Sequence, residues 1–144
     1  MIAIADTSGL LALFNRTDPE HTQVAIATNA CGLLVVSPLT LTELHQIASI
    51  RADRRVADAI LRTLVARVEA TRVAIADTTP RLLTTALAVR DHYTDLDLDL
   101  ADATAVGLAA EYRTDVVLTL DRRDFRAIRP LTGHKAFRLL PDDL

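Results

Sequence analysis

Acidic side chains stand in this sequence where a buried strand would give way to a helix. Asp6 follows the apolar run 2–5, and Asp121 follows the run 115–120. In open α/β sheets, ligands bind beyond the carboxyl ends of the strands, where both residues would fall. Asp77 follows the run 72–76 in the same way, so this position alone is a weak signal. Asp6 is equally suited to cap a helix, because aspartate accepts hydrogen bonds from backbone N–H groups there.

Two further acids are expected on helices. Glu43 falls in the second turn of a helix that starts at Pro38, where it would either face solvent or join a site. Asp102 follows Asp99 by three residues, so the two share a helix face, and Asp99 is placed to cap that helix. The rest of the helix is small and apolar, so Asp102 would be costly to bury without a compensating partner.

A metal ion would compensate such a group of acids. Carboxylates that converge at one end of a sheet repel one another, and some of them bind protons at neutral pH. Ligation by oxygen alone suits Mg²⁺ or Mn²⁺. The four histidines show no metal-binding spacing, and the single cysteine, Cys31, excludes an internal disulfide. No dinucleotide-binding, Walker A or serine-hydrolase motif occurs in the chain.

The apolar residues alternate between strand-like runs and helical spacing. Strands are expected over 2–5, 32–38, 72–76, 115–120 and 136–140. Helices are expected from a cap at Thr7 or Ser8 to Asn15, after a cap at Asp18, and over 38–50, 53–69, 80–92 and 100–112. Leu83, Leu87 and Val89 would point inward from the helix over 80–92. This order predicts an α/β fold in one domain, 1–144, with a mostly parallel central sheet and helices on both faces.

Composition narrows the class of protein. The chain has 144 residues and a formal net charge of −3, which argues against a broad surface that coats nucleic acid but allows a local basic rim. No apolar stretch approaches the ~20 residues that cross a bilayer, and no export signal is recognisable at the N-terminus. We therefore expect a cytoplasmic protein without a membrane segment.

Four segments together resemble a known family. They are "IADTSGLLALF", "VVSPLTLTEL", "LDLADATAVGLA" and "VVLTLDRRDF", and in this order and spacing the chain resembles a PIN domain, within that group the VapC toxins of bacterial toxin–antitoxin pairs. The resemblance implies a Rossmann-like fold and an endoribonuclease that depends on Mg²⁺ or Mn²⁺. Its acidic quartet would be Asp6, Glu43, Asp102 and Asp121, supported by the hydroxyls of Thr7 or Ser8 and Thr119, with Asp99 and Asp124 as additional acids nearby.

The resemblance also implies partners. The substrate would be a structured stable RNA, such as tRNA or the sarcin-ricin loop of 23S rRNA, and translation would be inhibited. A cognate antitoxin would fill the acidic groove of a homodimer. Arg122 and Arg123 are nearest in sequence to the acids and would either rim the site or lie in solvent. The helix over 53–69 would line the groove, form the dimer contact or simply pack into the core.

Other functions stay open at this stage. A PIN scaffold that binds RNA or protein without cutting would carry the same fold. A receiver-like signalling domain also gathers acids around Mg²⁺, but such domains usually carry paired acids after the first strand, and here Thr7 and Ser8 follow Asp6. A haloacid-dehalogenase-type phosphatase needs a second acid where Ser8 stands.

Overall fold

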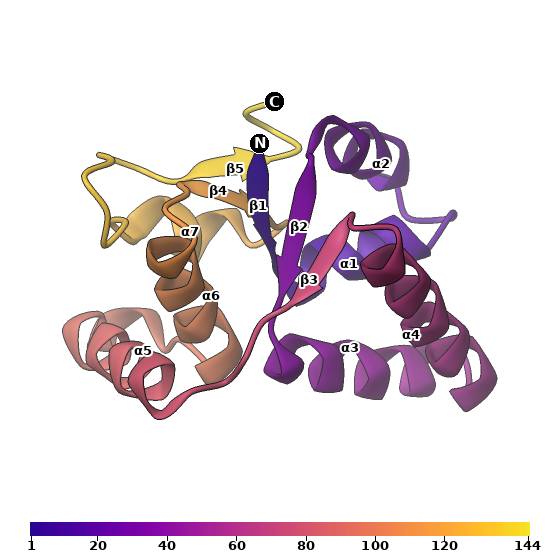
Figure 1. The fold of residues 1–144 in the computed structure, drawn as a ribbon, viewed down its shortest axis with the longest axis horizontal. Coiled ribbons are helices and arrows are strands. Elements are labelled where there is room, and N and C mark those ends of the chain that lie inside the picture. Colours follow the sequence, from indigo (N-terminus) through magenta and orange to yellow (C-terminus); the bar gives the residue numbers. More distant parts are fainter.

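The computed structural model describes residues 1–144, whose centre is a five-stranded sheet in which every neighbouring pair of strands is parallel. The strand order is β3-β2-β1-β4-β5, as Figure 1 shows. The strands are β1 (Ile2–Ala5), β2 (Leu33–Val36), β3 (Val73–Ile75), β4 (Val116–Leu118) and β5 (Arg138–Leu140). The predicted α/β fold with a parallel central sheet is confirmed.

Helices cover both faces of this sheet (Figure 1). They are α1 (Thr7–Phe14), α2 (His21–Ala30), α3 (Pro38–Arg51), α4 (Arg54–Glu69), α5 (Pro80–His92), α6 (Leu100–Glu111) and α7 (Arg122–Ala127), with a short 3₁₀ turn over Thr94–Leu96. Alternation along β1 divides the core: Ala3 and Ala5 pack with α1 to α4, whereas Ile4 packs with α5 to α7. No helix is both long and apolar enough to span a membrane.

Local caps place two of these helices where the sequence predicts them. The Ser37 hydroxyl accepts a hydrogen bond of 3.2 Å from the backbone N–H of Thr40, with Pro38 as the first helical residue. Thr79 caps α5 in the same manner, ahead of Pro80. Each cap ends a loop that follows a strand, so α3 and α5 both start at the carboxyl edge of the sheet.

Two predicted helix starts are wrong. The first helix begins at Thr7 with Asp6 in the capping position, so neither Thr7 nor Ser8 caps it. The second begins at His21 and not directly after Asp18. Asp18 instead closes a turn by accepting a 2.8 Å hydrogen bond from the N–H of Glu20.

The buried face of α5 also differs from the prediction. Leu82, Ala86 and Val89 are buried, whereas Leu87 is 51% exposed and Leu83 is half-buried. The cause is the neighbouring helix α6, where Gly107 lets Leu82 approach so closely that a Cβ on Gly107 would lie 2.9 Å from Leu82 Cδ1. The tertiary contact therefore decides which leucines of α5 face inward.

Candidate active site

Asp6 lies at the carboxyl end of β1 and is 4% exposed. Its Oδ2 atom accepts hydrogen bonds from the hydroxyls of Thr119, at 2.8 Å, and Ser8, at 3.1 Å. Asp6 stands in the capping position of α1, but its side chain accepts no capping hydrogen bond. Burial raises the pKa of Asp6, although the hydrogen bonds lower it. The carboxyl group is thus held by side chains and not used as a helix cap.

The two hydroxyls also join the first turn of α1 to the loop after β4. Ser8 Oγ and Thr119 Oγ1 lie 3.2 Å apart. Ser8 accepts a hydrogen bond from the N–H of Leu120, and Thr119 accepts one from the N–H of Asp121, each at 2.9 Å. The Thr7 hydroxyl is buried without a partner. Of the expected supporting pair Thr7 or Ser8, Ser8 is therefore the residue that contacts Asp6.

Three further carboxylates meet beside this network. Asp102, Asp121 and Asp124 each offer an oxygen atom within 4.8 Å of the others, and all three side chains are partly buried. Asp99 caps α6 by accepting a 2.8 Å hydrogen bond from the N–H of Asp102. Asp121 caps α7 through the N–H of Asp124. The starts of α6 and α7 therefore converge, and their dipoles favour negative charge there.

The pKa shifts show that these acids act on one another. The pKa of Asp102 is raised to about 8, first by burial and then by the charges of Asp6 and Asp99, with Asp121 adding to the effect. Burial and the charge of Asp121 likewise raise the pKa of Asp124. Asp6 follows β1, Asp102 lies in α6 and Asp121 follows β4, so the fold gathers acids that are far apart in the sequence.

Glu43 stands outside this three-carboxylate group. It lies in the second turn of α3, is half-buried, and makes no hydrogen bond or salt bridge. Helix α3 packs against α6, which carries Asp102. The Glu43 carboxylate is therefore left free on a helix that borders the site.

Arg122 and Arg123 have different surroundings. Arg122 forms a bidentate pair with Asp142, at 2.6 and 2.8 Å, and also pairs with Glu20. These two partners raise the pKa of Arg122 and neutralise its charge. The ion pairs also connect α7 to the start of α2 and to the C-terminal segment. Arg123 is exposed and forms no salt bridge, so it is the one of the two that is free to meet an anion.

Comparison with known proteins identifies the class. The PIN domain model matches residues 3–130, so the chain belongs to the PIN domain family. It is 36% identical over 140 residues to ribonuclease VapC26 of Mycobacterium tuberculosis, an alignment that covers 96% of this chain and 99% of that protein. The chain is thus a VapC-type PIN domain, as the four sequence segments indicate.

Solved structures share the fold at lower sequence identity. VapC20 of Mycobacterium tuberculosis, described as a sarcin-ricin loop cleaving toxin, superposes with a TM-score of 0.73 at 21% identity over 85% of this chain and 92% of that chain. VapBC2 of Rickettsia felis, bound to a promoter DNA fragment, gives a TM-score of 0.65 at 16% identity over 92% and 96%. Both likenesses support the architecture described above.

Proposed function

We propose that the protein is the toxin of a toxin–antitoxin pair, an endoribonuclease that requires Mg²⁺ or Mn²⁺ and cleaves structured stable RNA. The observation that carries this proposal is the group of acids at the carboxyl edge of the sheet, where Asp102, Asp121 and Asp124 lie within 4.8 Å of one another. A chain related to ribonuclease VapC26 over nearly its whole length is expected to share that type of activity.

The residues present fit a divalent cation. Oxygen ligands are what Mg²⁺ and Mn²⁺ prefer. Burial and the neighbouring charges of Asp6 and Asp99 raise the pKa of Asp102 to about 8, a repulsion that a bound cation would relieve. We assign metal binding to Asp6, Glu43, Asp102 and Asp121, with Asp124 close enough to Asp102 and Asp121 to join them. A bound ion would lower the pKa of an attacking water and stabilise charge on the scissile phosphate.

The other polar residues position these acids. Ser8 and Thr119 fix the Asp6 carboxyl group through two hydrogen bonds, so its orientation is set before any ligand arrives. Asp99 and Asp121 hold the first turns of α6 and α7. Arg123 is free to attract an RNA phosphate to an otherwise acidic edge. RNA is the substrate we propose, either tRNA or the sarcin-ricin loop, in the cytoplasm.

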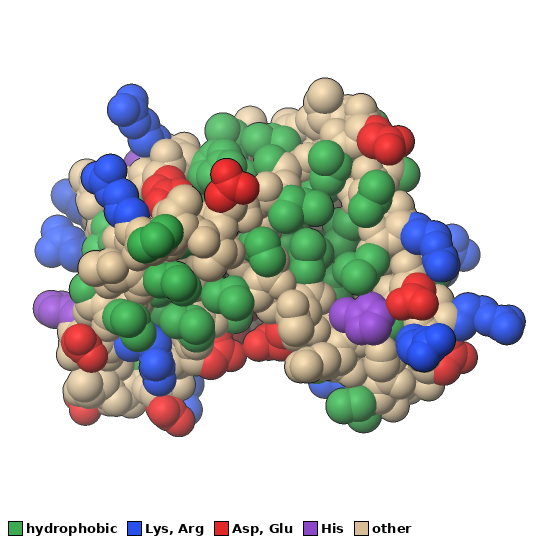
Figure 2. Space-filling model, turned by 60° about the horizontal axis from the view of Figure 1, so that its bottom comes forward, with side chains coloured by type: hydrophobic (Ala, Val, Ile, Leu, Met, Phe, Trp, Pro, Cys, Tyr) green, Lys and Arg blue, Asp and Glu red, His purple; other side chains and the backbone are tan.

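The proposed protein partners are a cognate antitoxin and a second copy of the chain. Large apolar side chains remain exposed, among them Ile50 at 83%, Leu87 at 51% and Ile75 at 43%. Figure 2 shows apolar side chains gathered across the middle of one face, with basic side chains at its margins. Such a patch is typical of a protein that associates with another protein.

Sedimentation of the purified chain at micromolar concentration is expected to show a dimer. Detection of the monomer alone would exclude the proposed homodimer.

The cleavage assay uses a matched pair of variants. The purified chain, free of antitoxin, is incubated with total bacterial RNA in Mg²⁺ or in EDTA, and the new RNA ends are mapped. We expect discrete ends that require metal and disappear in Asp6→Asn. Asp77→Asn is the control, since Asp77 follows β3 as Asp6 follows β1 but is exposed and unbonded.

Each outcome of this assay is informative. Cleavage by Asp77→Asn but not by Asp6→Asn, with equal circular dichroism spectra, supports the assignment and identifies the RNA target. Absence of cleavage of any stable RNA by the folded wild type would contradict the proposal and favour a PIN scaffold that does not cut.

A further inference from the structure

Two adjoining pockets lie at the edge of the sheet opposite the acids. The first, about 190 Å³, lies where β2 and β3 begin and is lined by Arg67, Arg72 and Thr28 among others. The second, about 450 Å³, shares Arg67, Thr28 and Asn29 with the first and extends to Arg16 and His21 beside the end of α1. We call this continuous depression the arginine trough, defined by Arg16, His21, Thr28, Asn29, Arg67 and Arg72.

No acidic side chain pairs with the arginines of the arginine trough. No aspartate or glutamate lines either pocket, although the chain as a whole carries a net charge of −3. Arg16, Arg67 and Arg72 form no salt bridge, in contrast to Arg122 and Arg126, which pair with acids. Three guanidinium groups that line one depression without an acidic partner attract an anion.

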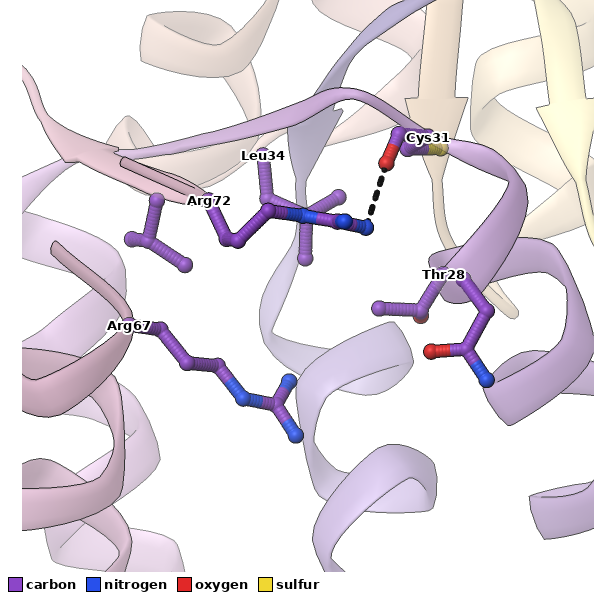
Figure 3. A pocket seen from close by; sticks show the side chains of 7 residues that line it. Thr28, Cys31, Leu34, Arg67 and Arg72 are labelled. Atoms are coloured by element: carbon purple, nitrogen blue, oxygen red, sulfur yellow. Dashed lines mark hydrogen bonds between the residues drawn. The ribbon is translucent and has the colours of Figure 1, made fainter. Parts of the chain in front are cut away.

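The two arginines of the smaller pocket keep donors free. Arg72 gives one hydrogen bond of 2.9 Å to the carbonyl oxygen of Cys31. The Arg67 guanidinium lies over the Phe14 ring, 5.5 Å from its centre. Figure 3 shows both side chains reaching across the pocket toward the end of α2. A guanidinium has five N–H donors, so each arginine retains several that no protein atom accepts.

The free donors of the two arginines suit a phosphate. Thr28 lines both pockets, but it is 7% exposed and its hydroxyl is enclosed by protein. The guanidinium groups therefore supply the donors that face the pocket, and their N–H groups match the acceptor oxygens of a phosphate.

We propose that the arginine trough binds backbone phosphates of the RNA on which the acidic site acts, an inference that rests on the proposed function. Helix α1 links the two places, because it begins directly after Asp6 and ends at Phe14, beneath Arg67. Its eight residues span about 12 Å, a distance that a few nucleotides of RNA cover. The size of the second pocket, about 450 Å³, and its further arginine favour a chain of phosphates over one small ion.

The test measures RNA binding without cleavage. A fluorescent single-stranded RNA 20-mer of mixed sequence is titrated with the full-length protein in EDTA, by fluorescence anisotropy at several salt concentrations. The double variant Arg67→Gln/Arg72→Gln is expected to bind ~30-fold more weakly and to lower the slope of log K against log salt by ~1.4, about 0.7 per lost phosphate contact. The control is Arg129→Gln, an exposed arginine without a salt bridge that lines a separate pocket against α5, on the other face of the sheet.

The outcomes separate this inference from the proposed ribonuclease activity. Weak RNA binding by the folded double variant, with normal binding by Arg129→Gln, supports RNA binding at the arginine trough even if the wild type cuts no RNA. Equal RNA affinity in both variants overturns it, even if RNA cleavage is intact. Inorganic phosphate that raises the melting temperature of the wild type only, with RNA affinity unchanged in the double variant, would assign the trough to free phosphate and also overturn it.

Discussion

Replacement of Asp102 by asparagine is expected to lower the rate of RNA cleavage ~1,000-fold and at the same time to stabilise the metal-free protein. The reason is the pKa of about 8 at Asp102, which records burial and the repulsion by Asp6 and Asp99. A carboxyl group whose pKa is raised by folding contributes stability at low pH and loses it as the pH rises through the folded value. For Asp102 that loss falls between about pH 4 and pH 8.

The stability change is measured by thermal unfolding in EDTA between pH 5 and pH 8.5. Because part of the Asp102 side chain reaches solvent, we expect Asp102→Asn to raise the free energy of unfolding by only ~1–2 kcal/mol at pH 8, or the melting temperature by ~3–8 °C. The stability of the variant should also depend less on pH than that of the wild type. Asp91→Asn is the control, since Asp91 is exposed on α5 and makes no hydrogen bond. If Asp102→Asn cut RNA at the wild-type rate, Asp102 would not belong to the active site. If it were less stable than the wild type at pH 8, the Asp102 carboxylate would not be destabilised by its surroundings.

Substitution of Gly9 by alanine is expected to destabilise the fold by ~3 kcal/mol, or ~10 °C, and to impair the site. A Cβ at this position would lie 2.5 Å from the carbonyl oxygen and 2.9 Å from the carbonyl carbon of Leu118, both backbone atoms at the end of β4. The backbone cannot yield without separating α1 from β4. That separation would also break the contact between Ser8 and Thr119 that holds Asp6.

Other glycines provide the matched comparison for Gly9→Ala in thermal unfolding and cleavage assays. A Cβ at Gly133 meets nothing within 4 Å, so Gly133→Ala should change stability by no more than ~1 kcal/mol. At Gly107 the nearest atom is Leu82 Cδ1, at 2.9 Å, the flexible end of a side chain. The gain in helix propensity there offsets part of the crowding. Equal stability of Gly9→Ala and Gly133→Ala would contradict the close packing of α1 on β4.

The local part of the fold is readable from the sequence. Two helix starts are predictable from a capping residue followed by proline, namely Ser37 with Pro38 and Thr79 with Pro80. A helix cap can be recognised locally because it involves only residues that are neighbours in the chain. Asp18 with Pro19 gives the same signal, yet the helix begins at His21. There His21 Nδ1 lies 2.9 Å from the carbonyl oxygen of Ala12, a contact with α1 that no local pattern contains.

The site is readable only in part, for a similar reason. Asp6 and Asp121 are predictable as residues that follow strands, but their proximity depends on β1 and β4 being neighbours in the sheet. The strand order is not apparent from a single sequence. The place of Asp124 beside Asp102 follows from the meeting of α6 and α7. Arg122 has partners 102 and 20 residues away, in Glu20 and Asp142, so its neutralised charge could not be foreseen.

The most direct test of a metal-dependent acidic site is titration calorimetry with Mn²⁺ at pH 7, in two buffers that differ in ionisation enthalpy. Because the pKa of Asp102 is about 8, its carboxyl group carries a proton in most protein molecules at pH 7. A metal ion that binds to this carboxyl group must displace the proton. We predict saturable binding that releases about one proton per protein, with weaker binding and little proton release in Asp102→Asn. Failure of Mn²⁺ to bind, or binding with no proton release that is unchanged in Asp102→Asn, would contradict the assignment of this carboxylate group as the metal centre.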